Sequence, residues 1–229
     1  MKSGRFSTAM TTAGESSTLP DIPEGVDHLI YAVPDLETGI NEIHQLLGVR
    51  PMIGGRHPDY GTRNALVALG PKTYLEVMAP DPEQARPERG RLFGLDALDE
   101  AFLATWVLRR ESIESLVARA SAAGVHFGPV CSGSRENADG TTLSWKLTDP
   151  YIALMDGLVP FLIAWGDTPH PASSAPLGGE LIGLRIEHPQ SDAVRAALDA
   201  VGVQMRVQQS TRKRLVATIL TDKGVVELH

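Results

Sequence analysis

The chain has 229 residues, 42% of them apolar, which is enough for one compact domain or two small ones with a sizeable core. Its formal net charge of −7, with no basic run longer than 212–214, argues against nucleic acid or an anionic membrane as the main partner. A single cysteine, Cys131, excludes an internal disulfide and a multi-cysteine zinc site, and it fits a cytoplasmic location.

Residues 1–25 are predicted to form a mobile N-terminal tail. The segment up to Pro20 is small and polar, and it has no continuous apolar stretch of the signal-peptide type. No apolar run elsewhere approaches the roughly 20 residues that cross a bilayer. We therefore expect a soluble protein with no membrane partner.

A first structural unit is predicted at 26–80. A nearly continuous apolar run at 27–33 indicates a strand, and Asp35 can cap the helix that follows, whose apolar positions 36, 40, 43 and 47 share one face. Gly48 supplies a left-handed exit. Further strands are expected from 49, at 64–69 and at 73–79, with the turn Gly70-Pro71 between the last two. The order of elements is β-α-β-β-β.

The same order recurs at 104–168 and at 180–229. The second unit has expected strands at 105–109, 125–130, 142–147 and 160–165, with a helix capped by Ser112; the third has strands at 181–187, 215–220 and 225–228, with a helix capped by Ser191. Gly48, Gly124 and Gly202, each followed by valine, lie 76 and 78 residues apart, which indicates an internal repeat. Because one unit alone leaves sheet edges exposed, we expect copies to pair.

Several segments together resemble glyoxalase-like proteins of the vicinal oxygen chelate superfamily: HLIYAVPDL, GGRHPDYGTRNAL, KTYLEVMAPDP, LVPFLIAWGDTPHP and LRIEHP. The resemblance covers about residues 26–229, as one glyoxalase-like domain. It implies an α+β fold in which repeated β-α-β-β-β modules form a curled mixed sheet around a small-molecule cavity. A homodimer is also considered as an assembly.

The resemblance also implies a divalent metal, often held by one residue from the first and one from the last strand of each module. His28 and Glu76 occupy these positions in the first module, and strand alternation lets each face the cavity. The matching residues of the second module, Thr105 and Ile163, are not ligands, whereas Glu227 of the third matches Glu76. The predicted set of His28, Glu76 and Glu227 suits Zn, Fe, Mn, Ni or Co but is incomplete. Without the resemblance, a simple hydrogen bond between His28 and Glu76 is the favoured interpretation.

Other candidates surround the expected cavity. The loop before the third strand carries His57 and Asn64 as candidates for substrate binding, and Arg63 as a candidate for catalysis or for bidentate binding of an anionic substrate. Trp145 of the second module is a further substrate-binding candidate, although tryptophans on such strands more often belong to the core. Glu76 is a candidate for proton transfer as well as for metal binding.

Three functional hypotheses follow. The leading one is a metal-dependent lyase, isomerase or dioxygenase that acts on a small oxygen-rich substrate. The alternative is a metal-free protein that binds or sequesters a hydrophobic or cationic ligand, which the missing ligands of the second module, the three tryptophans and the negative charge favour. In the third, the third module takes the role of a partner subunit. The sequence leaves these open, together with which modules pair.

Overall fold

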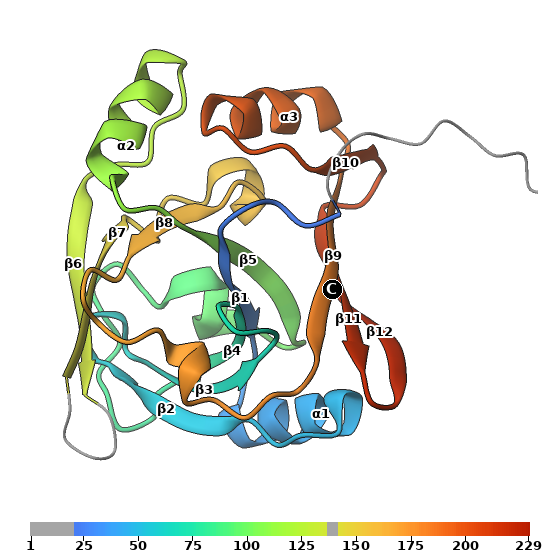
Figure 1. Cartoon of the computed structure of the whole chain (residues 1–229). Coiled ribbons are helices and arrows are strands. Elements are labelled where there is room, and N and C mark those ends of the chain that lie inside the picture. The colour runs from blue at the N-terminus through green and yellow to red at the C-terminus, as the bar shows by residue number, and fades with distance from the viewer. Residues whose placement is uncertain (1–20, 137–141) are drawn as a thin grey trace, which may run out of the picture.

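The computed structural model describes residues 21–136 and 142–229, so positions 1–20 of the predicted tail lie outside the described residues. Positions 21–25 of that tail are described and are bound to the fold, because Asp21 O accepts from Leu184 N and Gly25 O from Arg109 N. The described strands form two sheets, one of eight strands and one of four (Figure 1). The large sheet contains β1 (Val26–Ala32), β2 (Met52–His57), β3 (Thr62–Ala68), β4 (Tyr74–Pro80), β5 (Phe102–Arg109), β6 (Val130–Glu136), β7 (Thr142–Thr148) and β8 (Phe161–Ala164).

The first two modules together build the large sheet. Its strand order is β2-β3-β4-β1-β5-β8-β7-β6. Within each module the first and last strands pair in parallel, β1 with β4 and β5 with β8, and the modules meet where β1 and β5 run antiparallel. The sheet curls into a nearly closed, barrel-like shape, as Figure 1 shows. This confirms the predicted α+β fold and identifies the first two modules as the pair that shapes the cavity.

The helices are α1 (Leu36–Leu47), α2 (Ile113–Ala122) and α3 (Ser191–Ala200), and short 3-10 turns lie at Pro58–Tyr60, Leu92–Ala97, Leu154–Gly157 and Pro171–Ser173. Helix α1 begins and ends as predicted. The side chain of Asp35 accepts a hydrogen bond from the Thr38 backbone, and Gly48 adopts a left-handed φ of 79° while its N–H donates to His44 O. None of the helices in the described ranges combines the length and apolarity that crossing a membrane requires.

The third unit has the predicted order of elements but a different strand arrangement. Its sheet contains β9 (Glu180–His188), β10 (Arg206–Gln209), β11 (Arg214–Thr221) and β12 (Gly224–Leu228), in the order β10-β9-β11-β12. Its first strand, β9, pairs with β10 in parallel and with β11 antiparallel, whereas β1 pairs with the last strand of its own module. The glycine repeat therefore identified a shared strand-helix start, which is local, and not a shared sheet topology.

Two apolar layers lie on opposite faces of the curled sheet. The outer layer joins β1, α1 and α2 to α3 and the four-stranded sheet through residues such as Leu29, Ile40 and Leu184. The inner layer lines the concave face and includes Ile30 and Ile163. Because side chains alternate along a strand, β1 sends Leu29 outward and His28 and Ile30 inward. The third unit thus covers the outside of the sheet, and the concave face is left to the first two modules.

One strand of the second module is shifted from its expected place. A strand was expected at 125–130, but β6 begins only at Val130. Gly128, with φ of 71°, and Pro129 interrupt the extended conformation before it. The shift moves Arg135 into β6.

Candidate functional site

The concave face encloses a pocket whose empty space, with its open mouth included, is about 550 Å³. Both modules line it. The polar lining residues are His28, His57, Tyr60, Asn64, Glu76 and Arg135. The aromatic lining residues besides Tyr60 are Tyr74, Phe93, Trp145, Phe161 and Trp165.

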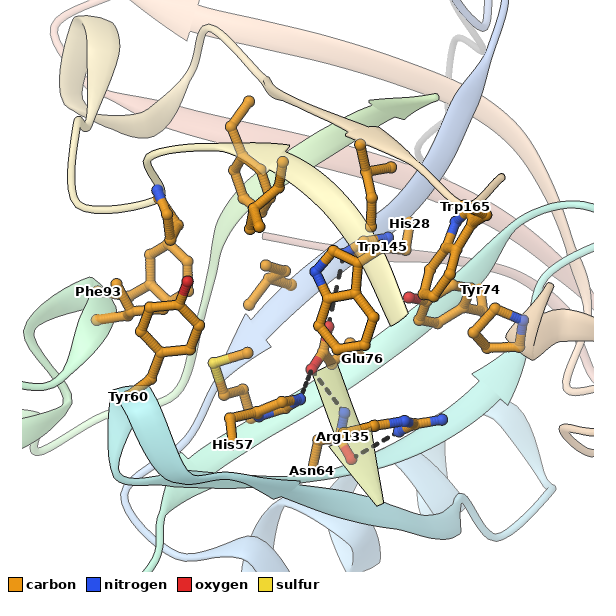
Figure 2. A pocket seen from close by; sticks show the side chains of 18 residues that line it. His28, His57, Tyr60, Asn64, Tyr74, Glu76, Phe93, Arg135, Trp145 and Trp165 are labelled. Atoms are coloured by element: carbon orange, nitrogen blue, oxygen red, sulfur yellow. Dashed lines mark hydrogen bonds and ion pairs between the residues drawn. The ribbon is translucent and has the colours of Figure 1, made fainter. Parts of the chain in front are cut away.

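Glu76, on β4, is the polar centre of the pocket (Figure 2). Its Oε1 accepts a hydrogen bond from Nδ2 of Asn64 at 2.7 Å and lies 3.9 Å from Nε2 of His57. Its Oε2 lies 3.5 Å from Nε2 of His28. The Glu76 side chain is only 7% exposed, so these neighbours replace most of its hydration.

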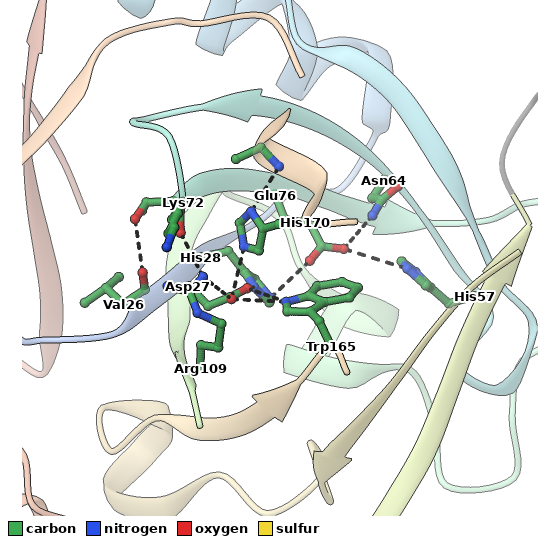
Figure 3. A network of polar contacts seen from close by, with 12 residues as sticks. Val26, Asp27, His28, His57, Asn64, Lys72, Glu76, Arg109, Trp165 and His170 are labelled. Atoms are coloured by element: carbon green, nitrogen blue, oxygen red, sulfur yellow. Dashed lines mark hydrogen bonds and ion pairs between the residues drawn. The ribbon is translucent and has the colours of Figure 1, made fainter. Parts of the chain in front are cut away.

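His28 is held from behind by Asp27 (Figure 3). The two side chains meet at 2.8 Å, between Nδ1 of His28 and Oδ1 of Asp27. Asp27 is fully buried and has three more polar neighbours: Nε1 of Trp165 at 3.1 Å, Nε2 of His170 at 3.1 Å and Nη1 of Arg109 at 3.3 Å. Arg109 is on β5, and Trp165 and His170 lie in the segment that follows β8, so Asp27 ties both modules together.

Asp27 is ionised in this setting. Burial alone would raise its pKa, but hydrogen bonds from His170 and His28, and the charges of these two residues, hold the pKa well below its usual value. An ionised carboxylate can only accept hydrogen bonds, so Nδ1 of His28 carries a proton and Nε2 is the atom that faces Glu76. Bare lone pairs on Nε2 and on Oε2 would repel each other in this buried site. A proton or another positive charge between them therefore stabilises the His28–Glu76 pair.

His57 approaches the other oxygen of Glu76. Burial lowers the pKa of His57; the charge of Glu76 opposes this shift and that of Arg135 adds to it. The neutral imidazole can accept a hydrogen bond at Nδ1 from the Thr62 hydroxyl, 3.1 Å away, and turn its Nε2 proton toward Glu76. The two imidazoles thus differ in role, because Nδ1 of His28 contacts the Asp27 carboxylate, whereas Nδ1 of His57 contacts the Thr62 hydroxyl.

Asn64 connects Glu76 to Arg135 on the far side of the pocket. Its Oδ1 accepts from the Gly55 backbone at 2.8 Å and from Nη1 of Arg135 at 3.2 Å, while its Nδ2 donates to Glu76. A Cβ at Gly54 would lie 2.2 Å from Oδ1 of Asn64 and 2.6 Å from Nη1 of Arg135. Glycine at position 54 thus leaves room for the side chains of Asn64 on β3 and Arg135 on β6 to meet across the open side of the sheet.

Aromatic rings form the remaining wall. Tyr74 stacks on His28 with ring centroids 4.6 Å apart, and Phe161 meets the same imidazole edge-on at 6.4 Å. Trp145 and Trp165 lie 5.3 Å apart. Burial raises the pKa of Tyr74 well above its usual value, so this phenol stays neutral. The pocket therefore surrounds one carboxylate with apolar rings, a setting that strengthens electrostatic interactions.

The structure brings most of the predicted site residues together. His28, Glu76, His57, Asn64 and Trp145 all line the one pocket. This grouping places the residues but leaves their chemical roles as predictions.

Two predicted site residues lie elsewhere. Arg63 is on β3 next to Asn64, where alternation turns it to the outer face, and its Nη2 is 4.0 Å from Oδ2 of Asp35. Glu227 is on β12 of the separate four-stranded sheet, half exposed, and its Oε1 accepts from Nη1 of Arg185 at 2.6 Å. Neither residue is among those that line the pocket, so the catalytic expectation for Arg63 and the metal-ligand expectation for Glu227 gain no support from the geometry.

The pocket does not offer the donor set of a complete metal centre. His28 pairs with Tyr74 across β1 and β4, as Val107 pairs with Phe161 across β5 and β8, so Val107 and not Thr105 is the counterpart of His28. Ile163 lies two residues after Phe161, as Glu76 lies two residues after Tyr74, so Ile163 is the counterpart of Glu76. At these two positions the second module thus has apolar side chains, as expected. In the part of the chain that the structure describes, no three His, Cys, Asp or Glu side chains are grouped to hold a metal ion.

Sequence reasoning missed Asp27 and Arg135. Asp27 had a visible signal, because a second polar residue beside His28 in an apolar strand needs a partner when buried. Arg135 stands in the polar stretch SGSREN, which reads as a loop. Its place in the pocket depends on the curl of the sheet, for which no local pattern exists.

Comparison with known proteins agrees with this fold. A family model described as a Glyoxalase-like domain matches residues 26–202. A hypothetical protein from Staphylococcus aureus has a similar structure, with a TM-score of 0.63 and 11% identity over 89% of this chain and 98% of that one. Methylmalonyl-CoA epimerase from Mycobacterium tuberculosis has a TM-score of 0.42 and 22% identity over 67% of this chain and 94% of its own, too low a likeness to indicate function. No curated protein matches the sequence.

The fold and the pocket are those of a glyoxalase-like protein. The family model covers more than three quarters of the chain, and the chain therefore belongs to the Glyoxalase-like domain family. This confirms the resemblance that the sequence motifs indicated.

The anchoring role of Asp27 predicts a stability change. Because the pKa of Asp27 is lower in the folded chain than its usual 3.8, its ionised form stabilises the fold above that pH, and this contribution is lost as the pH falls below it. We expect Asp27→Asn to lower the free energy of unfolding at pH 7 by about 3 kcal/mol. Denaturant unfolding at pH 7 and pH 3 measures both effects. An unchanged free energy at pH 7 would contradict the role, and the exposed Asp192→Asn is the control.

Proposed function

We propose that this protein is an isomerase or lyase that moves a proton on a small carbonyl compound, with Glu76 as the base. One observation carries the proposal: a buried carboxylate faces two imidazoles inside an aromatic pocket. Such a carboxylate, shielded from water and held by directed hydrogen bonds, is suited to general acid–base catalysis. Its attachment to the middle of the eight-stranded sheet keeps it rigid.

The proposed reaction starts at a carbon next to a carbonyl group. Glu76 takes a proton from this carbon, the C–H bond breaks, and its electron pair moves to the carbonyl oxygen as an enolate. In an isomerisation the proton returns to the same carbon on its other face or to a neighbouring carbon. In an elimination the electron pair expels a leaving group from the next carbon instead. Both outcomes balance without an oxidant or a reductant.

His28 serves Glu76 as the second proton holder in this proposal. With Nδ1 fixed by Asp27, its Nε2 can share a proton with Oε2 of Glu76 over 3.5 Å. A proton taken by Glu76 therefore has a nearby acceptor, and it can be returned from the same side of the pocket. Asn64 donates a hydrogen bond to Oε1 and keeps the carboxylate oriented, and Nε2 of His57 lies 3.9 Å from the same oxygen.

A metal-free binding protein is the second candidate. Its support is the apolar second-module half of the pocket, where Val107, Phe161 and Ile163 stand in the places of the first-module polar residues. Such a protein would bind a ligand without exchanging its protons. Proton exchange therefore separates the two candidates.

The proposal predicts hydrogen–deuterium exchange at the substrate carbon. Proton NMR in D2O, with a panel of small 2-oxo and 3-oxo compounds, measures loss of the α-proton signal. We expect the wild-type protein to accelerate exchange for at least one compound and Glu76→Gln to slow it about 10²- to 10⁴-fold, the usual contribution of a general base. The control Glu227→Gln should keep the wild-type rate. Equal rates for Glu76→Gln and the wild type, or ligand binding with no exchange at all, would contradict the proposal.

The incomplete donor set predicts a reaction that tolerates chelation. We expect the exchange rate to stay within about twofold of its starting value after EDTA treatment, since the proposed general-base step depends on protein groups. Metal analysis of the purified protein should find less than one equivalent of Zn, Mn, Fe, Co or Ni. Loss of exchange on EDTA treatment, with recovery on adding one of these metals, would restore the metal-dependent hypothesis with His28 and Glu76 as ligands.

The cellular setting stays a prediction from the sequence. We propose a cytoplasmic location, which the single cysteine supports. A homodimer also stays a prediction, and size-exclusion chromatography with light scattering measures it directly.

A further inference from the structure

We propose that the substrate carries a carboxylate that binds to Arg135, and that this contact turns the reacting carbon toward Glu76. The inference deepens the proposed function by naming the substrate class, and it rests on that function only for the fate of the proton. Its binding part stands alone, because Arg135 and Glu76 are separate groups on different modules.

Arg135 is a positive charge kept inside the pocket. It is 7% exposed and lines the same space as Glu76 and Trp145. Among the side chains that the structure describes, which leave out Glu136 and residues 137–141, no ion pair within 4.0 Å includes it, and its hydrogen bond in that set goes to the neutral Oδ1 of Asn64. A buried guanidinium with a neutral partner gains most from an anion that enters the pocket.

The backbone around Arg135 is shaped to admit it. Any side chain at Gly54 would collide with Nη1 of Arg135 and with Asn64, at 2.6 and 2.2 Å from its Cβ. Gly55 then donates its N–H to the same amide oxygen that Arg135 contacts. The contacts at Gly54 and Asn64 therefore hold the guanidinium near Glu76, with Asn64 between the two (Figure 2), and its planar fork suits a carboxylate.

The position of Arg135 relative to Glu76 fits a compound whose carboxylate lies near its reactive carbon. One amide group, that of Asn64, spans the two residues through Oδ1 and Nδ2. Near His28 the pocket disfavours an anion, because the Glu76 carboxylate lines it there. A substrate carboxylate thus has one favourable place, and the carbon beyond it lies between Arg135 and Glu76. The aromatic rings of Trp145 and Phe161 are then left for an apolar remainder.

Arg135 also joins β6 to β3, and a purely structural tie would explain its burial as well. The two roles differ in what they predict. A structural tie makes Arg135 variants less stable but leaves the pocket indifferent to the charge of a ligand. A carboxylate site distinguishes an acid from its neutral amide of the same shape.

The test compares phenylacetate with phenylacetamide by isothermal titration calorimetry. We expect the wild-type protein to bind phenylacetate at least tenfold more tightly than phenylacetamide, and Arg135→Gln to weaken phenylacetate about ten- to hundredfold without weakening phenylacetamide. Arg135→Lys keeps the charge and loses the planar fork, so its affinity should fall in between. Arg63→Gln, which changes an arginine on the outer face of β3, is the matched control and should bind as the wild type does.

Equal affinity of the wild type for acid and amide, no measurable binding of phenylacetate, or unchanged binding by Arg135→Gln would overturn the proposal. Circular dichroism checks that each variant is folded, and Arg135→Lys supplies the result if Arg135→Gln is not. Glu76→Gln separates this inference from the proposed function. Phenylacetate binding that persists in Glu76→Gln supports the carboxylate site even when no compound shows proton exchange.

Discussion

The buried carboxylate of Asp27 is the interaction on which the rest of the site depends. It lies on β1, at the seam between the two modules, and its partners come from β5 and from the segment that follows β8. A carboxylate without exposure needs several donors to stay ionised, and this one receives them from both halves of the sheet. The same atoms that join the modules also decide which nitrogen of His28 faces Glu76. The Asp27 carboxylate therefore both joins the two modules and sets the orientation of the His28 ring in the site.

The two halves of the pocket have divided their roles. In the first module the cavity-facing positions are His28, Tyr74 and Glu76, and in the second the register places Val107, Phe161 and Ile163 there. The pseudo-symmetric fold thus offers polar groups from one side and an apolar wall from the other. Arg135 is an exception, because it reaches the polar side from the edge strand of the second module. Such an arrangement orients a molecule that is charged at one end and apolar at the other.

The sequence predicted the features that depend on local periodicity. Alternation along β1 and β4, together with the family resemblance, was enough to bring His28 and Glu76 to one cavity. The sequence did not predict on which face Arg63 lies, because the strand was expected to start at 64. Since β3 starts at Thr62, alternation puts Arg63 and Asn64 on opposite faces. The comparison with the second module was shifted because His28 lies 20 residues before Gly48, whereas its counterpart Val107 lies 17 before Gly124. The helix and the part of the strand that follows the matched residue are both shorter in the second module, so distances counted back from the glycines do not mark equivalent positions.

The remaining features depend on long-range geometry. Arg135 meets Asn64 only because the sheet curls, and a local pattern contains no information on curl. The third unit repeats the order of elements and even the glycine exit, yet β9 chooses different neighbours from β1. Strand pairing is decided by which faces and edges remain to be covered once the first two modules have closed on each other. Glu227 was matched to Glu76 on the assumption of equal topology, and the different pairing removes that match.

The protonation of the two ring nitrogens of His28 is the most direct test of the proposed proton sharing between His28 and Glu76. Long-range proton–nitrogen NMR of the histidine rings identifies which ring nitrogens of His28 carry protons, in the wild type and in Glu76→Gln. We expect a protonated Nδ1 in the wild type and in Glu76→Gln, and an Nε2 signal that changes when the Glu76 carboxylate is replaced. A His28 ring with a bare Nδ1, or an Nε2 signal that is the same in the two proteins, would contradict the proposed proton sharing.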